Sequence, residues 1–446
     1  MTNPNSPCLL LNLHLPVCKL MEATAPTRVR PWPAITVATM IVGYAGYYLC
    51  RSDLSVARPL ILDQYASIGV TKETIGNLTG LATALYALGK FIFGSTADLL
   101  GGRRMFLLGM AGAVLCTILF GAGGPPLFLM AWCGNRFIQA SGWVGMVKIT
   151  SRWFRHSVYG SVMGLISLSF LFGDFLSRLF LSELITLKFS WQSIFFVSAA
   201  VLAVIFFAAI PLLRETPGER GLPEPETNPE ALVSEEAPKG LGDILRPLLT
   251  SPTFWTVCAL SFGFTFMRET FNDWTPTYLH EAVGMSSDAA GRASSLFPLF
   301  GGFSVLAVGF LSDKFGRTGR ALLIAGGLAV GTVGLVALAH ASLGQGATVA
   351  IVAGTGFVLI GPYSLLAGAI SLGFGGRHAS ATAAGWIDGV GYIGGILSGK
   401  LIGEVATRQG WGPAFNILAI TAALSCVMAV VYWARERKRP VLASGS

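Results

Sequence analysis

The sequence predicts an all-α membrane protein of twelve transmembrane helices, arranged as two pseudo-symmetric bundles of six. Three observations predict it: a strongly apolar composition, apolar stretches of membrane-spanning length, and a pattern that recurs between the two halves. Of the 446 residues, 53% are hydrophobic and 12% are charged, and the mean hydropathy is +0.63. Ordinary soluble domains carry about a quarter charged residues, so this composition excludes a water-soluble globule.

Stretches of about twenty apolar residues recur along almost the whole chain, and each is long enough to cross roughly 30 Å of hydrocarbon. The predicted spans are 34–58, 74–97, 105–123, 126–148, 158–181, 191–213, 253–279, 290–311, 321–341, 347–372, 380–402 and 412–433.

The net charge of +8 resides mainly in alternate loops, which indicates helix orientation rather than a nucleic-acid partner. One side would carry Arg28, Arg30, Arg103, Arg104, the run "KITSRWFRH", Lys314, Arg317, Arg320, Arg377 and the tail "RERKR". The other side would carry little beyond Lys72, Lys188, Arg292 and Arg408. The positive-inside rule therefore predicts that both termini are cytoplasmic. We expect a multi-pass monomer in a bacterial inner membrane, with the lipid bilayer as its surroundings.

Cysteine and histidine usage predicts neither a disulfide framework nor a metal site. Five of the seven cysteines fall inside predicted spans, and the sequence has no CxxC motif or cluster of Cys with His. The five histidines are scattered, and no Ser/His/Asp or nucleotide motif has supporting context. We therefore expect no enzymatic activity and no cofactor.

The first twenty residues have an apolar patch that is too short and too Pro-interrupted to span, without the basic region of a secretory signal. Because Met21 follows, one hypothesis is that translation begins there. N-terminal sequencing that finds residues 1–20 on the native protein would exclude it.

The chain divides into two halves around a segment rich in Glu and Pro, "RETPGERGLPEPETNPEALVSEEAPKG". The predicted organisation is a tail at 1–33, a six-helix bundle at 34–213, a cytoplasmic linker at 214–252, a second bundle at 253–434 and a tail at 435–446.

The halves share the frame G-x-x-x-D-x-x-G, in "GSTADLLGGRR" from Gly94 and "GFLSDKFGRTGR" from Gly309. Asp98 and Asp313 hold the same place in the two copies. Gly164 and Gly173 likewise recur as Gly385 and Gly394 at a constant separation. Such duplication is typical of transporters whose substrate site lies at the midplane between two halves.

The G-x-x-x-D-x-x-G-x-R loop resembles the cytoplasmic signature of the major facilitator superfamily. The resemblance implies that Asp98 and Arg103, with Asp313 and Arg317 in the second copy, hold neighbouring helix ends together and help gating. The alternative is that the motif is an ordinary acidic helix end followed by arginines that only orient the chain in the membrane. Two copies of the motif at equivalent positions make this alternative less favourable.

Charged residues inside the spans are candidate functional groups, because an ionised side chain near the bilayer centre costs about 3 kcal/mol. The basic ones are Arg51, Lys90, Arg136, Arg178, Arg268 and Lys400, and the acidic ones are Asp174, Glu269, Asp273 and Asp388. Asp174 and Arg178 are four residues apart and are expected to pair on one helix face. Lys400 lies near a helix end, where it can extend its ammonium group to water.

Arg51 and Arg268 occupy equivalent places in the two halves, roughly 22–26 Å along the 34–58 and 253–279 spans. Glu269 follows Arg268 directly, and adjacent helical residues point about 100° apart, so we expect both guanidinium groups to be left for an external anion. A guanidinium group matches phosphate oxygens bidentately. Lys90 is expected to add a third positive charge. The alternative role for Arg51 is that of an arginine whose side chain extends to water instead of binding an anion.

With these residues, the chain resembles the organophosphate:phosphate antiporters. The matching segments are "GYAGYYLCRSDLSVARP", "LYALGKFIFGSTAD", "QASGWVGMVKITSRWF", "RETFNDWTPTYL", "GPYSLLAGAIS" and "ATAAGWIDGVGYIGG", within roughly residues 35 to 435. The resemblance implies that Arg51 and Arg268 bind phosphate and that Lys90 is a further contact.

Three residues depart from the pattern. Ser169 stands where many members have a histidine, and Arg136 stands where these exchangers usually carry a small residue. Asp388 resembles an aspartate of the eukaryotic sugar-phosphate branch. We expect Arg136 and Asp388 to neutralise each other or other charges of the site.

The predicted function is exchange of an organic phosphate ester, such as glycerol 3-phosphate or a sugar phosphate, for inorganic phosphate by alternating access. Candidate aromatic residues for the organic part are Tyr44, Tyr47, Tyr48, Trp143, Tyr278, Tyr363 and Trp386, for which helix packing is the alternative role. Two other functions stay open: a membrane sensor of sugar phosphates, and a proton-coupled organic-anion symporter that uses Arg136 and Asp388.

Overall fold

The computed structural model describes residues 31–226, 231–233, 238, 240–341 and 343–438. These residues form helices and connecting loops, with no strand in the described part of the chain. Most of the 1–33 tail, the hypothesis about residues 1–20, and parts of the 214–252 linker and of the 435–446 tail lie outside the described residues.

The first half of the chain forms long helices connected by short loops. They are α2 (Trp32–Tyr65), α3 (Lys72–Leu100), α4 (Gly102–Ala122), α5 (Pro125–Trp153), α6 (Tyr159–Thr186) and α7 (Trp191–Leu212), with short 3-10 turns at Ala66–Ile68, His156–Val158 and Pro217–Arg220. Local sequence sets several of these boundaries. Thr71 caps α3 through a capping box with Thr74, and Pro125 starts α5, where its missing N–H costs nothing.

The second half contains α8 (Leu241–Leu249), α9 (Pro252–Glu281), α10 (Ser287–Ser294), α11 (Leu296–His340), α12 (Gln345–Leu365), a π-helical turn at Leu366–Ile370, α13 (Ser371–Gln409) and α14 (Trp411–Lys438). Two glycines break this run. Gly316 divides α11 and Gly376 divides α13, each with a positive φ that glycine adopts without strain. With these breaks, the long helices of the described residues match the predicted spans in position, which is consistent with the predicted count of twelve.

The membrane-spanning, all-α fold is confirmed. Eight helical stretches of the described residues are long and apolar enough to cross a membrane, and two of them contain the breaks at Gly316 and Gly376. Helices α5 and α9 are as long but less apolar, and they carry polar and charged residues that include the partly buried Arg136 and Arg268 and the buried Lys148. Polar and charged residues inside a span thus lower its mean hydropathy, so that a hydropathy criterion overlooks it.

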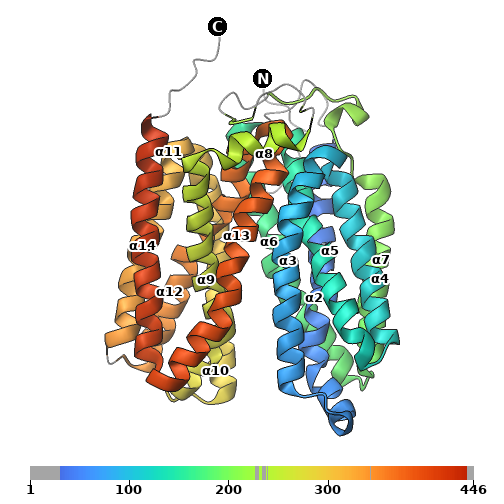
Figure 1. Ribbon diagram of the computed structural model, residues 1–446, viewed down its shortest axis with the longest axis vertical. Helices are drawn as coiled ribbons and strands as arrows, with labels where there is room; N and C mark the ends of the chain where they lie inside the picture. Colours follow the sequence, from blue (N-terminus) through green and yellow to red (C-terminus); the bar gives the residue numbers. More distant parts are fainter. Residues whose placement is uncertain (1–30, 227–230, 234–237, 239, 342, 439–446) are drawn as a thin grey trace, which may run out of the picture.

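The two halves form two bundles that stand side by side, blue to green and yellow to red in Figure 1. Helices α2–α7 pack mainly on one another, and so do α9–α14. The bundles meet where α3 crosses α13 and where α6 crosses α11. The domain boundaries proposed from the sequence stay a prediction.

Both crossings between the bundles use glycines of the internal repeat. A methyl group placed on Gly385 would lie 2.3 Å from the carbonyl oxygen of Lys90 and 2.9 Å from the Cα atom of Gly94. At the other crossing, a methyl group on Gly309 would lie 3.4 Å from the Cα atom of Gly164. Because the repeat equates Gly94 with Gly309 and Gly164 with Gly385, the two contacts are related by the pseudo-symmetry of the halves. Only glycine permits such backbone approach.

Replacing Gly385 by alanine should loosen the α3–α13 crossing. The added methyl group meets backbone atoms that cannot rotate away, so we expect a destabilisation of about 1–3 kcal/mol. Thermal unfolding of the detergent-purified protein measures it. Gly399→Ala on the same helix is the matched control, since nothing lies within 4 Å of that position. Equal melting temperatures for the two variants would contradict this packing.

Candidate functional site

A polar cavity lies between the two bundles and is lined by residues of both. We call it the central cavity. Its lining comprises Tyr44, Tyr48, Tyr86, Lys90, Trp143, Ser167 and Phe170 from the first bundle, and Arg268, Tyr363, Ser364, Ala367, Asp388 and Tyr392 from the second. Most of these side chains are aromatic or charged, and the sequence predicted most of the charged ones.

Arg51 lies beside the central cavity and is held by neutral groups. Its Nε donates to the amide oxygen of Gln139 at 3.1 Å, and one terminal nitrogen donates to the hydroxyl of Tyr48 at 3.2 Å. The guanidinium carbon is 4.7 Å from the ring centre of Tyr48 and 4.8 Å from that of Tyr86. Nη2 is buried without a hydrogen-bond partner, and no described carboxylate lies within ion-pairing distance. The positive charge of Arg51 therefore remains uncompensated, as the sequence predicted.

Arg268 differs, because Glu269 pairs with its Nη2 atom. The expectation that both guanidinium groups lack a protein carboxylate is therefore wrong for Arg268. The two side chains leave the helix in different directions, but both are long enough to bend toward each other. The guanidinium carbon also lies 4.5 Å from the ring centre of Tyr363 and 6.0 Å from that of Tyr392, and Nε is buried without a partner. Arg268 can therefore still donate hydrogen bonds to an anion, but its positive charge is already paired with the carboxylate of Glu269.

Lys90 and Asp388 form an ion pair across the two bundles. The ammonium nitrogen lies 2.8 Å from Oδ2 of Asp388, and the side chains are 1% and 7% exposed. Lys90 therefore adds a positive charge to the site that Asp388 balances in this structure, and its contact with the substrate stays a prediction. Of the two alternatives expected for Asp388, the structure shows the second, because Asp388 neutralises another charge of the site, Lys90, which α3 brings to α13, rather than Arg136. Arg136 has no described carboxylate within ion-pairing distance.

Tyr86 brings three cations of the first bundle together. Its ring centre lies 4.8 Å from the guanidinium carbon of Arg51, 5.1 Å from that of Arg136 and 5.0 Å from Nζ of Lys90. The cations are thus at most about 10 Å apart, and at an effective dielectric constant of about 20 each pair repels by about 1.7 kcal/mol or more. The ring attracts each cation by about 0.5–2 kcal/mol without adding a negative charge. An anion that enters would relieve the remaining repulsion.

The predicted aromatic residues separate into two groups. Tyr44, Tyr48, Trp143 and Tyr363 line the central cavity. Tyr47 does not, since its hydroxyl donates to the carbonyl oxygen of Phe106 at 2.5 Å and the residue is fully buried.

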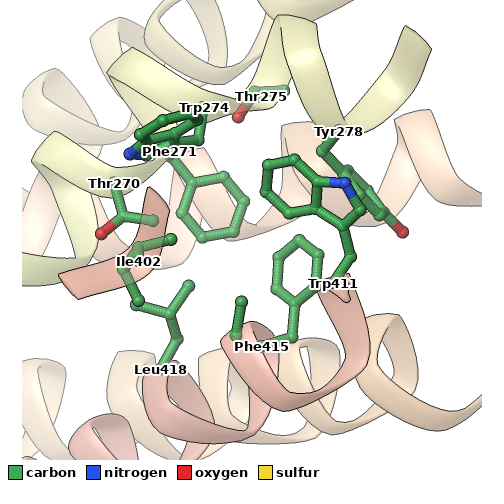
Figure 2. A pocket seen from close by; sticks show the side chains of 10 residues that line it. Thr270, Phe271, Trp274, Thr275, Tyr278, Ile402, Trp411, Phe415 and Leu418 are labelled. Carbon is green, nitrogen blue, oxygen red and sulfur yellow. The ribbon is translucent and has the colours of Figure 1, made fainter. Parts of the chain in front are cut away.

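Two other predicted aromatic residues also lie outside the central cavity. Trp386 packs edge-on against Phe91, with ring centres 5.1 Å apart. Tyr278 lies in a separate apolar pocket of the second bundle, where its ring packs against Trp411 and Phe415 (Figure 2). Helix packing is the role that these contacts favour for both residues.

Asp98 and Arg103 join helix ends, as the resemblance implied, but they act at different junctions. Asp98 accepts hydrogen bonds from the backbone N–H of Thr382 at 2.6 Å, and pairs with Lys148 at 2.8 Å. Lys148 also donates to the carbonyl oxygen of Arg377 at 2.7 Å, so α3 and α5 are tied to α13 of the other bundle.

Arg103 acts within one bundle. Its Nε and Nη2 donate to the carbonyl oxygens of Leu213 and Ile210, at 2.8 Å each. These carbonyl groups lie at the end of α7, where helical backbone acceptors lack partners.

The second copy of the motif repeats this pattern. Asp313 accepts the backbone N–H groups of Gly160 and Ser161 at 2.7 and 2.6 Å, at the start of α6 in the other bundle. A carboxylate at a helix N-terminus accepts hydrogen bonds from backbone N–H groups that have no partner within the helix, and its negative charge interacts favourably with the helix dipole. Arg317 pairs with Glu436 at the end of α14 at 2.8 Å. The pseudo-symmetric aspartates thus close the two bundles together at the end that carries the basic loops.

Asp174 and Arg178 pair as predicted, at 2.9 Å on α6. Their side chains are 37% and 52% exposed, and Ser52 on α2 donates to Asp174 at 2.6 Å. The pair therefore lies outside the central cavity.

Family comparison agrees with this architecture, since residues 40–399 match the model described as "Major Facilitator Superfamily". The chain belongs to this superfamily. A probable hexose phosphate transport protein of Chlamydia trachomatis is 26% identical over 95% of this chain and 97% of its own. A glycerol-3-phosphate transporter of Bacillus subtilis is 27% identical (89% and 90%), and the membrane sensor protein UhpC of Escherichia coli is 25% identical (90% and 92%).

Relatives over most of the chain thus confirm the resemblance to the organophosphate:phosphate antiporters. A solved structure of the human organic anion transporter MFSD10 shares the superfamily's fold with a TM-score of 0.70. It covers 90% of this chain and 100% of its own, at 14% identity.

Sequence reasoning missed several residues of the site. Tyr86, Gln139 and Tyr392 hold the cations, and Lys148 holds Asp98, but neutral residues and a lysine near a basic loop carry no local signal. Asp53 was also missed. It is fully buried on α2, with one carboxylate oxygen accepting the N–H of Leu54 and the other unpartnered. Asp53 lies five residues before the predicted end of the 34–58 span, and a single acidic residue near a predicted helix boundary gives little signal.

Removing the Lys148 ammonium group should weaken the closed end of the molecule. In Lys148→Met, the side chain of Asp98, which is 0% exposed, loses its countercharge, and breaking such a buried pair costs about 3–5 kcal/mol. Thermal unfolding in detergent tests this. Arg408→Met is the control, because its pair with Glu404 is 73% and 44% exposed and contributes little. A melting temperature of Lys148→Met equal to that of the control would refute the role of this pair.

Proposed function

We propose that this chain is a secondary transporter that exchanges an organic phosphate ester for inorganic phosphate by alternating access. The observation that carries the proposal is the uncompensated cationic charge of Arg51 and Arg136 around Tyr86, beside a cavity shared by two bundles. Guanidinium groups bind phosphate oxygens in a planar, bidentate manner, which favours a phosphoryl group over other anions.

The charge balance of the site fits a phosphoryl group. Of four cations, Arg51, Lys90, Arg136 and Arg268, two are ion-paired with the carboxylates of Asp388 and Glu269, so two guanidinium groups have no ion-pair partner among the described residues. A phosphate monoester carries about −1.5 to −2 charges at neutral pH. Such a ligand neutralises the site, whereas a monocarboxylate leaves one positive charge in a low-dielectric environment.

The aromatic lining supports an organic substituent on the phosphate. Tyr44, Tyr48 and Tyr363 contribute apolar ring faces and hydroxyl groups, and Trp143 contributes an apolar ring whose indole N–H donates to the carbonyl oxygen of Ala367 at 3.1 Å. Such surfaces suit the carbon backbone and hydroxyl groups of glycerol or a sugar. The names of the relatives, a hexose phosphate and a glycerol-3-phosphate transporter, support this substrate class.

Exchange follows from the cost of moving unpaired cations. The closed end carries the basic loops, which the positive-inside rule assigns to the cytoplasm together with both termini. To open the cavity to the other side of the membrane, the carrier must pass through an occluded state in which the cavity is closed to water on both sides. A bound anion offsets the repulsion in that state, so the loaded carrier turns over and the empty one resists.

We propose a monomer in a bacterial inner membrane as its setting.

A membrane sensor of the same ligand is the second candidate, and the similarity to UhpC favours it. A proton-coupled organic-anion symporter is a third candidate. It would use Arg136 and Asp388, and in this structure Asp388 is ion-paired with Lys90 rather than with Arg136.

Counterflow into proteoliposomes distinguishes these functions. Vesicles loaded with inorganic phosphate should take up labelled phosphate or a phosphate ester from a panel, and should ignore non-phosphorylated acids of similar size. Saturable binding without counterflow would identify a sensor. Uptake driven by an imposed pH gradient, without phosphate inside, would identify a symporter and contradict exchange.

Arg51→Lys and Arg268→Lys should each abolish exchange, by more than about 100-fold, while the protein stays in the membrane. A lysine keeps the positive charge but cannot donate two parallel hydrogen bonds as a guanidinium group does. We expect the occluded state to depend on that bidentate contact, so its loss should lower the rate. Initial rates of phosphate counterflow measure the effect. Arg178→Lys, in an exposed ion pair outside the cavity, is the matched control and should stay near wild type. Near-normal counterflow in either site variant would argue against the phosphate site.

A further inference from the structure

We propose that Asp388 is an internal competitor for the transported anion. It occupies Lys90 in the empty carrier and is displaced when a phosphoryl group enters. Asp388 thereby sets the affinity for the anion and links the two bundles only while the site is empty. This inference rests on the proposed function and gives Asp388 a role other than contact with the substrate.

The geometry of the pair supports competition. Oδ2 of Asp388 lies 2.8 Å from Nζ of Lys90, at the distance at which a phosphate oxygen would bind the same ammonium group. Both residues line the central cavity, and Arg268 lines it as well. Lys90 also lies 5.0 Å from the ring centre of Tyr86, which Arg51 and Arg136 share. An anion attracted by the two arginines therefore meets a lysine that a carboxylate already occupies.

The position of the pair along the helices gives it a mechanical consequence. Asp388 follows Gly385 by about one helical turn on α13, and Lys90 precedes Gly94 by about one turn on α3. Gly94 and Gly385 lie against each other where these helices cross, and a methyl group on Gly385 would reach the carbonyl oxygen of Lys90. The ion pair thus lies directly beside the crossing. Its formation or loss changes how strongly the two bundles are joined there.

The other carboxylate of the site provides a contrast. Glu269 pairs with Arg268, its neighbour on α9, so exchanging Glu269 for a phosphate oxygen breaks no contact between bundles. The Lys90–Asp388 pair joins α3 to α13 and therefore couples anion occupancy to bundle contact. Only differential interaction with two conformations lets a ligand shift the balance between them.

Removing the charge of Asp388 should tighten anion binding, which a supporting contact would not do. Asp388→Asn keeps the size of the side chain and loses the negative charge that competes for Lys90. We expect the purified protein to bind inorganic phosphate on the order of tenfold more tightly, measured by isothermal titration calorimetry in detergent. Asp388→Ser is a second neutral variant with the same expected direction, for use if Asp388→Asn does not fold. Lys90→Gln should bind phosphate more weakly than wild type.

A double-mutant cycle separates competition at Lys90 from a general gain in positive charge. In the Lys90→Gln background, Asp388→Asn should no longer tighten phosphate binding, because the contested ammonium group is absent. An equal gain in both backgrounds would overturn the proposal, since the effect would then be one of overall charge. Glu269→Gln is the matched control: it also removes one negative charge, and its effect should persist in the Lys90→Gln background.

The wild-type measurement separates this inference from the proposed function. Saturable phosphate binding in the wild type, with weaker or unchanged binding in both neutral variants of Asp388, overturns the competitor role and leaves the proposed function standing. Absence of saturable binding in the wild type and in all variants overturns both. Tighter binding in Asp388→Asn or Asp388→Ser that depends on Lys90 supports the proposal.

Discussion

The structure depends on holding cations in a low-dielectric interior without neutralising all of them. A carboxylate on every guanidinium group would remove the electrostatic cost and also the attraction for an anion. Arg51 is held instead by an amide oxygen, a hydroxyl group and two aromatic rings. These groups satisfy donors and attract positive charge, but they leave the net charge of the site unchanged. The surrounding helices keep this arrangement in place, and in the proposed function an anion balances the remaining charge.

The duplicated halves supply what such a site needs in order to transport. Each half contributes an arginine to the central region, an aspartate that binds the start of a helix in the other half, and glycines that permit close crossing. Asp98 and Asp313 close one end of the molecule through short hydrogen bonds to backbone donors. Contacts that consist of a few hydrogen bonds and glycine surfaces can be made and broken without unfolding either bundle. The same features that join the halves therefore permit them to rock.

Much of the fold could be predicted from the sequence, because a bilayer imposes a simple rule on span length and on the sign of loop charge. The motif around Asp98 and Asp313 also predicted that these residues hold helix ends together, but not that their partners lie in the other bundle. Individual pairings could not be predicted in the same way. The partner of Asp388 is Lys90 rather than Arg136, and Arg268 pairs with Glu269, because such choices depend on distances of a few ångströms between helices far apart in the chain or between side chains that bend. Neutral contributors such as Tyr86 and Gln139 became recognisable only when the cations around them were placed.

Equilibrium binding of labelled inorganic phosphate to the purified protein tests the central claim most directly, with sulfate and acetate as competitors. The account predicts one saturable site per chain, which phosphate esters compete for and acetate does not, and which disappears when the guanidinium group of Arg51 is replaced by a neutral side chain. Binding that acetate displaces as well as phosphate esters do, or that survives the loss of Arg51, would contradict it.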